Sequence, residues 1–168
     1  MPPLAMLKVP NAIFGLGLQV TNVIKGIVDD LARGVSYVPT DVLRSAGTDL
    51  ERLVGDPSDA AGRRVVAALV GRTLEWLDRA REYTLEIPAG DVDVRRFCAL
   101  PLLLALRTLA LAARSDRVFR EEALKITREE VAEIDEEVRR GAGDDDALDA
   151  LYARERKRVE TEIGLATA

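Results

Sequence analysis

The most apolar stretch of the chain, residues 97–113, places the strongest constraint on its fold. Arg107 interrupts the stretch, and its length falls short of a comfortable membrane span, which needs about 20 apolar residues. We therefore expect no transmembrane helix, but a buried helix from about Val92 to Ala113. Pro101 lies inside it. Because proline has no backbone N–H to donate, we expect a kink at this position. The kink is either tolerated in a core helix or shapes a cavity wall.

The rest of the chain also has a helical pattern, because no alternating apolar and polar run bounded by turn residues predicts a strand. The 168 residues suffice for one core, and 48% apolar residues are too many for a disordered protein. No internal repeat or long linker divides the sequence. We predict an all-α fold with a single helical domain over residues 1–168.

Local signals predict where the helices begin and end. The first helix is expected from about Pro10, which suits the first helical position, to Arg33, with Gly34 ending it and a loop reaching Pro39. Capping residues and turn residues predict the others at 41–45, from Thr48, from Ser58 to Leu85, from Thr127 to Gly141, and from Asp144–Asp146 to near Gly164. The mixed-charge segment Arg154 to Lys157 is expected to be a solvated helix face.

Composition excludes several kinds of chemistry. Histidine is absent, so a Ser-His-Asp triad, a Cys-His dyad and a His-ligated zinc site are excluded. Cys98 is the single cysteine, which excludes an internal disulfide and indicates a reducing compartment; because residues 1–10 lack a secretory signal pattern, we expect a cytoplasmic protein. The net charge of −5 argues against a nucleic-acid partner. What remains is carboxylate chemistry, in which Asp and Glu hold Mg²⁺ beside phosphate substrates.

Polar side chains form a stripe on the first predicted helix, whose other positions are largely apolar. At 3.6 residues per turn they share one face, spread over roughly 100°; they are Gln19, Asn22, Gly26, Asp29, Asp30 and Arg33. Asp29 and Asp30 would lie near the helix C-terminus, where the helix dipole disfavours them by about 0.3–1 kcal/mol unless a cation compensates. Two interpretations stay open: a solvated helix end, or a ligand site.

Residues 19–30 read Q-V-T-N-V-I-K-G-I-V-D-D, are followed by G-V-S-Y-V-P, and resemble the second aspartate-rich motif of squalene and phytoene synthases. Residues 96–105 resemble the F-C-x-x-P helix that lines the prenyl cavity in the squalene-synthase branch. Lys125 to Arg128 resembles the K-I-x-R segment of the family. Three ordered matches imply an all-α, isoprenoid-synthase-type helical bundle, of which this chain is roughly the C-terminal half.

The resemblance implies head-to-head condensation of two prenyl diphosphates, farnesyl or geranylgeranyl. Mg²⁺ ions would assist loss of the diphosphates, and NADPH would be the reductant in the squalene branch. An apolar cavity would keep the carbocation from water. The resemblance implies Asp29 and Asp30 as metal ligands, and it implies as substrate-binding residues Gln19, Asn22, Lys25, Tyr37, Phe97, Cys98 and Pro101. It also favours a cavity wall as the role of Pro101.

The chain departs from the family pattern at several positions. Gly26 stands where the motif has an Asp, Lys25 replaces an Arg, Asp29 replaces a Glu, and Val35 replaces an Arg. The half with the first aspartate-rich motif has no counterpart here. Gly26 supplies no ligand, and inside a helix it costs about 1 kcal/mol relative to Ala, which indicates either close packing or relaxed selection.

We therefore expect a squalene/phytoene-synthase-like prenyltransferase that is inactive alone and needs the missing N-terminal half. The alternative is a non-catalytic family member, a pseudoenzyme that acts as a binding or assembly partner. A third interpretation is a helical module that binds a prenyl chain without chemistry. Some predicted helices are apolar on more faces than so short a chain can cover. This pattern predicts a homo-oligomer or a complex with the missing half. Peripheral contact with a membrane surface is a further expectation.

Overall fold

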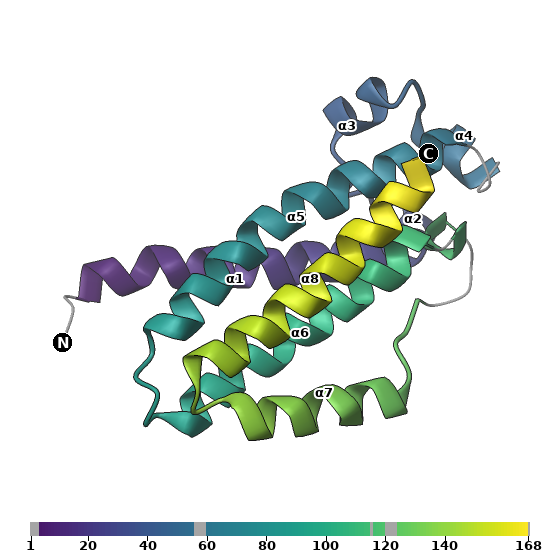
Figure 1. The fold of residues 1–168 in the computed structure, drawn as a ribbon. Coiled ribbons are helices and arrows are strands. Elements are labelled where there is room, and N and C mark those ends of the chain that lie inside the picture. The colour runs from purple at the N-terminus through teal and green to yellow at the C-terminus, as the bar shows by residue number, and fades with distance from the viewer. Residues whose placement is uncertain (1–3, 56–59, 115, 120–123, 168) are drawn as a thin grey trace.

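The computed structural model describes residues 4–55, 60–114, 116–119 and 124–167, and these segments are helices and loops with no strand among them (Figure 1). The helices are α1 (Leu4–Lys25), α2 (Ile27–Ala32), α3 (Thr40–Ser45), α4 (Leu50–Gly55), α5 (Ala60–Glu86), α6 (Val92–Arg114), the 3₁₀ helix η1 (Asp116–Phe119), α7 (Arg128–Gly141) and α8 (Asp145–Thr167). The prediction of an all-α fold is confirmed.

Helices α5, α6 and α8 lie side by side at the centre, and α1 crosses them on one side (Figure 1). Helix α5 runs opposite to α6, whereas α6 and α8 run in the same direction because α7 returns the chain along their edge. Gly17 sets the spacing between α1 and α5, since a Cβ atom there would lie 2.7 Å from Cδ2 of Leu77. Any larger residue at this position would require the Leu77 side chain to shift.

Apolar burial provides most of the packing between these helices. Each fully buried aliphatic side chain contributes about 1.5–3 kcal/mol relative to an exposed one. The fully enclosed side chains come from most of the helices and include Ile24, Leu53, Val65, Val70, Leu77, Leu106, Leu109, Ile134, Val138 and Val159.

Helix α6 is the predicted buried helix, and it continues through Pro101 to Arg114. By length and composition alone it is long and apolar enough to cross a membrane, but 67% of that stretch is buried inside the protein. Most of its apolar side chains therefore contact other helices of this chain, as expected for a core helix. The prediction that residues 97–113 form a buried helix is confirmed.

Arg107 lies in the middle of α6 and is 4% exposed. Its Nε and Nη2 atoms donate to the two carboxylate oxygens of Glu155 on α8, at 2.9 and 3.0 Å. Its Nη1 atom lies 3.2 Å from Glu133 and 3.5 Å from Glu130, both on α7. One guanidinium thus joins three helices, and these carboxylates raise the pKa of Arg107 well above its ordinary value.

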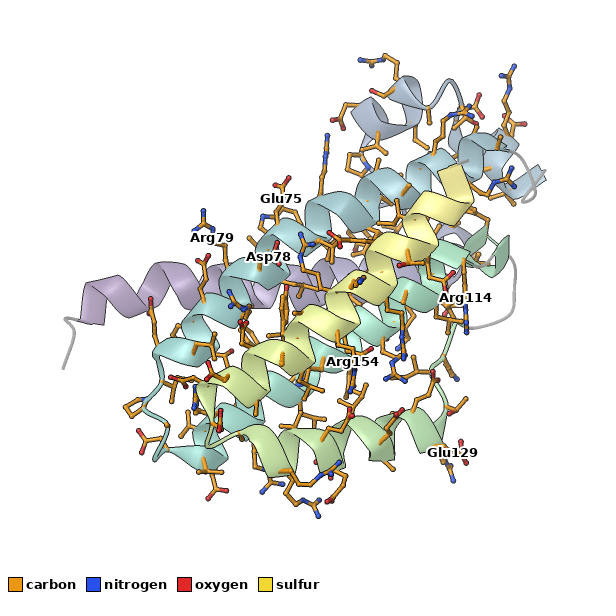
Figure 2. The ribbon with its side chains drawn as sticks, in the orientation of Figure 1. Glu75, Asp78, Arg79, Arg114, Glu129 and Arg154 are labelled. Atoms are coloured by element: carbon orange, nitrogen blue, oxygen red, sulfur yellow. The ribbon has the colours of Figure 1, made fainter. Side chains whose placement is uncertain are left out.

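Glu155 is 1% exposed, so the prediction of a solvated face over Arg154 to Lys157 is wrong at this position. Burial alone would raise the pKa of Glu155, but hydrogen bonds from Arg107 and Arg154 outweigh burial and hold it below its ordinary value. Arg154 reaches across to Glu137 of α7, and Figure 2 shows it between the two helices. Within this segment Glu155, Arg154 and Arg156 therefore bind α8 to its neighbours, whereas Lys157 is exposed to solvent as predicted.

A second polar cluster joins α5 to α8. The hydroxyl of Tyr152 donates to Asp78 at 2.8 Å, and Arg156 donates to both oxygens of the same carboxylate at 2.7 and 3.0 Å. A further polar contact lies near the N-terminal end of α6. The fully buried Arg95 donates to the carbonyl of Ala142 at 3.0 Å and pairs with Asp145. These contacts fix the turn between α7 and α8 against α6.

Several predicted helix ends differ from the structure. Helix α1 begins at Leu4, so Pro10 lies inside it, and Gly26 separates α1 from α2 where one helix was predicted. Asp49, not Thr48, caps α4, because its side chain accepts a hydrogen bond from the Arg52 amide at 2.9 Å. The predicted cap Ser58 lies outside the described residues.

The remaining predicted boundaries lie close to the observed ones. The capping box at Thr127 and Glu130 is confirmed, and Asp144 caps α8 by accepting from the Ala147 amide at 2.9 Å. Gly34, with φ of 76°, follows the end of α2. Helix α8 continues past the predicted end near Gly164 to Thr167.

Removing the carboxylate of Glu155 tests the role of the buried ion pair. Glu155→Gln leaves the Arg107 charge buried without its main partner, which costs about 3–5 kcal/mol of unfolding free energy. Because the pKa of Glu155 is lowered in the folded state, its contribution is present above the ordinary value of 4.5 and is lost as the pH falls below it. Urea unfolding between pH 3 and pH 7 measures both effects.

The exposed Glu75 on α5 offers a matched control. Glu75→Gln is expected to change the unfolding free energy by less than about 0.5 kcal/mol. The double variant Arg107→Met with Glu155→Leu should be more stable than Glu155→Gln, since neither charge remains buried. Equal stability of Glu155→Gln and Glu75→Gln would show that the pair contributes little.

Candidate functional site

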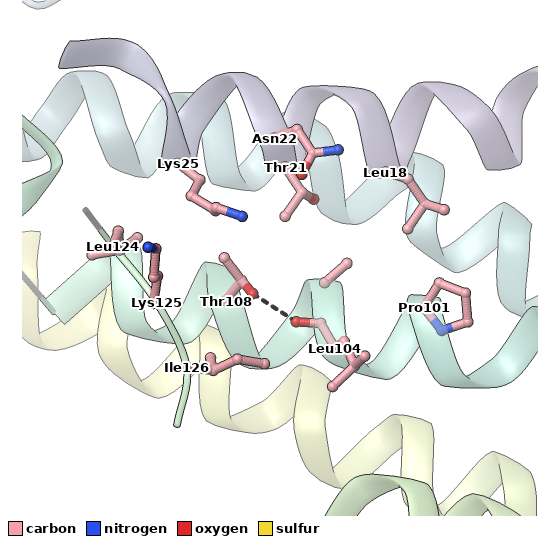
Figure 3. Close-up of a pocket in the computed structure, with 11 residues that line it drawn as sticks. Leu18, Thr21, Asn22, Lys25, Pro101, Leu104, Thr108, Leu124, Lys125 and Ile126 are labelled. Carbon is pink, nitrogen blue, oxygen red and sulfur yellow. Dashed lines mark hydrogen bonds between the residues drawn. The ribbon is translucent and has the colours of Figure 1, made fainter. Parts of the chain in front are cut away.

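A cavity of about 410 Å³ lies between α1, α6 and the segment 124–126 (Figure 3). This volume is within the range of small-molecule sites, roughly 300–1,000 Å³. Three segments that are far apart in the sequence meet at its wall. The residues that line it are Leu18, Thr21, Asn22 and Lys25 from α1, Pro101, Leu104, Ala105 and Thr108 from α6, and Leu124, Lys125 and Ile126.

The cavity is apolar at one end and cationic at the other. Figure 3 shows Leu18 and Pro101 together at one end, whereas Lys25 and Lys125 approach from opposite walls at the other. Both lysines are exposed to solvent. An elongated ligand with an apolar body and an anionic head matches this division of the walls.

The two threonine hydroxyls of the cavity act as acceptors toward a ligand. Thr108 donates its hydroxyl proton to the carbonyl of Leu104 at 2.8 Å, and Thr21 donates to the carbonyl of Gly17 at 2.8 Å. Side-chain donors for an anion are therefore the ammonium groups of Lys25 and Lys125 and the amide of Asn22. Among the described lining residues there is no carboxylate, and the local charge is positive although the chain carries −5.

Three of the predicted substrate-binding residues line the cavity: Asn22, Lys25 and Pro101. The role of Pro101 in a cavity wall, one of the two interpretations of its position, fits this placement. The others are not lining residues. Gln19 is exposed on α1, Tyr37 is 61% exposed in the loop after α2, and Phe97 is 80% exposed on α6.

Cys98 is buried in α6 beside Phe97, outside the cavity lining. Burial raises the pKa of its thiol, which keeps it protonated near neutral pH. The role of Cys98 as a substrate-binding residue stays a prediction, as does that of Gln19, Tyr37 and Phe97.

The break at Gly26 changes the setting of the two predicted metal ligands. Asp29 and Asp30 lie in the first turn of the short helix α2, not in the last turns of one long helix as predicted. Asp29 is exposed, whereas Asp30 is partly buried, and its Oδ1 atom lies 3.9 Å from Nη1 of the exposed Arg33. The hydrogen-bond ladder nevertheless passes the break, because the Asp30 amide donates to the Gly26 carbonyl at 2.9 Å.

The described residues do not fit a resident Mg²⁺ ion. No group of three or more Asp, Glu, Cys or His side chains among them could hold a metal. Asp29 and Asp30 do not line the cavity. Gly26 lies between Asp30 and the cavity residue Asn22 along the chain, and it has no side chain that could bind a metal. A metal centre at this motif therefore needs further carboxylates from outside the described part of the chain.

Lys125 and most of the apolar wall were not predicted as binding residues, although Leu104 and Ala105 lie within residues 96–105, which resemble the cavity-lining helix of the family. A spacing of three and seven residues from Pro101 places Leu104 and Thr108 on the same face of α6, and this periodicity could have identified them. Lys125 and Ile126 belong to the K-I-x-R segment, which resembled the family but was not assigned a site. Only the fold brings Lys125 opposite Lys25.

A family model for squalene/phytoene synthases matches residues 8–130 of this chain. The squalene synthase of Eremothecium gossypii is 31% identical over 104 residues, which cover 62% of this chain and 23% of that protein. The phytoene synthase of Pseudescherichia vulneris is 33% identical over 85 residues, which cover 51% of this chain and 25% of that protein.

The solved structure of TcSQS with the ligand E5700 has the same fold, with a TM-score of 0.72 at 23% sequence identity. The likeness covers 92% of this chain and 48% of that chain. The predicted isoprenoid-synthase-type bundle, amounting to about half of the complete fold, is confirmed. The chain spans about a quarter of the length of the curated relatives that it matches.

Restoring a carboxylate at position 26 tests whether the motif can still hold a metal. A Cβ atom there would lie 3.8 Å from Oδ2 of Asp30, so the carboxylate of Gly26→Asp could share a cation with Asp30. We expect Gly26→Asp to gain Mg²⁺-dependent binding of inorganic pyrophosphate, seen as a rise in melting temperature. Without Mg²⁺ the variant should be less stable than Gly26→Ala, because it crowds like charges.

Gly26→Ala is the matched control, since its Cβ meets the same backbone oxygen of Asn22 at 3.2 Å but brings no carboxylate. Asp30→Ala should abolish the gain in a Gly26→Asp background. If Gly26→Asp and Gly26→Ala respond alike to Mg²⁺ and pyrophosphate, residues 26–30 are a solvated helix end.

Proposed function

Because the chain belongs to the squalene/phytoene synthase family, we propose that it is the prenyl-binding portion of an enzyme that condenses prenyl diphosphates head to head. The observation that carries this proposal is the cavity between α1 and α6. Its wall contains Asn22 and Lys25 from the aspartate-rich motif, Pro101 from the F-C-x-x-P helix and Lys125 from the K-I-x-R segment. The three segments that resemble the family thus converge on one site.

The proposed roles follow from the chemistry of the walls. Leu18, Leu104 and Ile126 hold the prenyl chain and exclude water from the carbon that becomes cationic. Lys25 and Lys125 hold the diphosphate and stabilise the negative charge that it gains when the carbon–oxygen bond breaks. Lys25 provides a point charge there, not the planar fork of the Arg in the family motif.

The proposed enzyme is incomplete in this chain. A family member would supply Mg²⁺ to neutralise the diphosphate, and its ligands would come partly from a carboxylate-bearing half that has no counterpart here. We propose that this half is a separate polypeptide or a missing segment. We further propose that the resulting complex works in the cytoplasm and that NADPH is the reductant for a squalene-type reduction. Phe97 and Tyr37, at 80% and 61% exposure, are apolar surface available for such assembly.

A specific observation favours the alternative of a non-catalytic binding or assembly partner. Position 26 is a glycine where the family motif has an Asp, and the described residues contain no group of three metal-binding side chains. A chain of this kind would keep the cavity for a prenyl ligand without carrying out the condensation.

Reconstitution separates the two functions. Alone, with farnesyl diphosphate and Mg²⁺, the chain should release no diphosphate above a protein-free control, because loss of half of a carboxylate clamp removes charge stabilisation. Addition of the N-terminal half of a squalene synthase, expressed separately, should restore diphosphate release and give a prenyl product detectable by mass spectrometry.

Leu104→Trp provides the control, since it fills the cavity and should prevent restoration. Val54→Trp places the same side chain on α4 at a position that is 51% exposed, and it should behave as the wild type. Turnover by the chain alone would contradict the proposed incompleteness. Binding of farnesyl diphosphate without turnover in any reconstituted mixture would favour the non-catalytic partner.

A further inference from the structure

The carboxylate of Glu130, in the first turn of α7, contacts two different parts of the chain. Its Oε2 atom accepts a hydrogen bond from the amide of Thr127 at 2.9 Å, and the Glu130 amide donates to the Thr127 hydroxyl oxygen at 3.1 Å. Its Oε1 atom lies 3.5 Å from Nη1 of Arg107 on α6. One carboxylate therefore connects the end of the cavity segment 124–126 to a buried charge of the core.

Arg107 is a fixed anchor for this carboxylate. Its Nε and Nη2 atoms donate to the two carboxylate oxygens of Glu155, and Nη1 is directed toward α7. Because the guanidinium is planar and two of its nitrogens are held, the direction of Nη1 is fixed as well. Arg107 also precedes Thr108, which lines the cavity on α6. The helix that forms one wall of the cavity thus sets the position of Glu130.

The segment 124–126 has an anchor at each end. Leu124 is 3% exposed and belongs to the apolar core, whereas Thr127 is held by Glu130. Lys125 lies between these two anchors, and Figure 3 shows its side chain at the cavity. The placement of Lys125 therefore depends on the contact at each end of its segment.

Charge strengthens the contacts of Glu130. The hydrogen bond from the Thr127 amide, together with the nearby Arg107 guanidinium, holds the pKa of Glu130 below its ordinary value. The carboxylate is therefore ionised near neutral pH. Hydrogen bonds to an ionised group are roughly twice as strong as those between neutral groups, so one side chain is enough to hold the segment.

We infer that Glu130 is a positioning residue of the cavity, because its carboxylate joins the Thr127 amide to Arg107 and thereby holds Lys125 in the cavity wall. Glu130 is not one of the described lining residues, so it acts through Lys125. The role of Lys125 toward a diphosphate rests on the proposed function, whereas the position of the segment 124–126 does not.

Two measurements on the full chain test the inference. Calorimetric titration with farnesyl diphosphate in Mg²⁺ should show roughly tenfold weaker binding for Glu130→Ala, which loses both contacts. Glu130→Gln should weaken binding by about threefold, since glutamine keeps the bond from the Thr127 amide but loses the charge that pairs with Arg107. Backbone hydrogen exchange without ligand should be faster at residues 124–127 in Glu130→Ala than in the wild type.

Glu133→Ala is the matched control. Within the described part of the chain, Glu133 lies 3.2 Å from the same Nη1 atom of Arg107 but makes no polar contact with residues 124–127. This variant should bind farnesyl diphosphate as the wild type does and leave exchange at these residues unchanged. Slow exchange at the buried Ile134 and Val138 would verify that α7 remains folded in every variant.

A double-mutant comparison separates the positioning of Lys125 from a general loss of structure. In a Lys125→Gln background, Glu130→Ala should weaken binding by less than about twofold further, because the ammonium group that Glu130 positions is already absent. A merely structural role of Glu130 would give the same loss of affinity in both backgrounds.

Three results would overturn the inference: equal losses in the two backgrounds, a Glu133→Ala variant that binds as weakly as Glu130→Ala, or wild-type affinity of Glu130→Gln, which would show that Arg107 plays no part. If the wild type binds no farnesyl diphosphate, the proposed function fails, and exchange at residues 124–127 alone decides the inference. Faster exchange in Glu130→Ala but not in Glu133→Ala would then support it, and equal exchange in the two variants would overturn it.

Discussion

Arg107 carries a charge in the middle of the most apolar helix, and it is stable there because Glu155 supplies both carboxylate oxygens to its guanidinium. An isolated charge at this depth would be very costly, so α6 and α8 are stable only in the arrangement that pairs them. Glu130 and Glu133 of α7 form ion pairs with the same guanidinium. The pair thereby fixes the rotation of α6, which leaves Pro101, Leu104 and Thr108 facing α1 and the cavity.

The sequence predicted those parts of the fold that depend on neighbouring residues. The capping box at Thr127, the turn at Gly34 and the apolar face of α6 are local signals, and the structure contains all three. The ion pair was missed because Arg107 and Glu155 lie 48 residues apart, and the alternating charges around Glu155 read locally as a solvated surface. The break at Gly26 was missed because a single glycine is tolerated within many helices.

The site was predictable to a similar extent. Asn22 and Lys25 were found from the motif on α1, and Pro101 from the motif on α6, and all three line the cavity. Lys125 faces Lys25 only because α6 and η1 carry the chain back to α1, which no local pattern reveals. The role of Phe97 at a ligand stays a prediction; its side chain is 80% exposed, since no described segment of this chain packs over that turn of α6.

We propose that the cavity between α1 and α6 is the ligand site of this family member. Backbone hydrogen exchange with and without farnesyl diphosphate tests this proposal, because it reports on every segment at once. We expect slower exchange within residues 18–25, 101–108 and 124–126, with α7 and α8 unchanged. Protection confined to the opposite side of the bundle, around α5 and α8, or no protection at saturating ligand, would show that the ligand does not bind in this cavity.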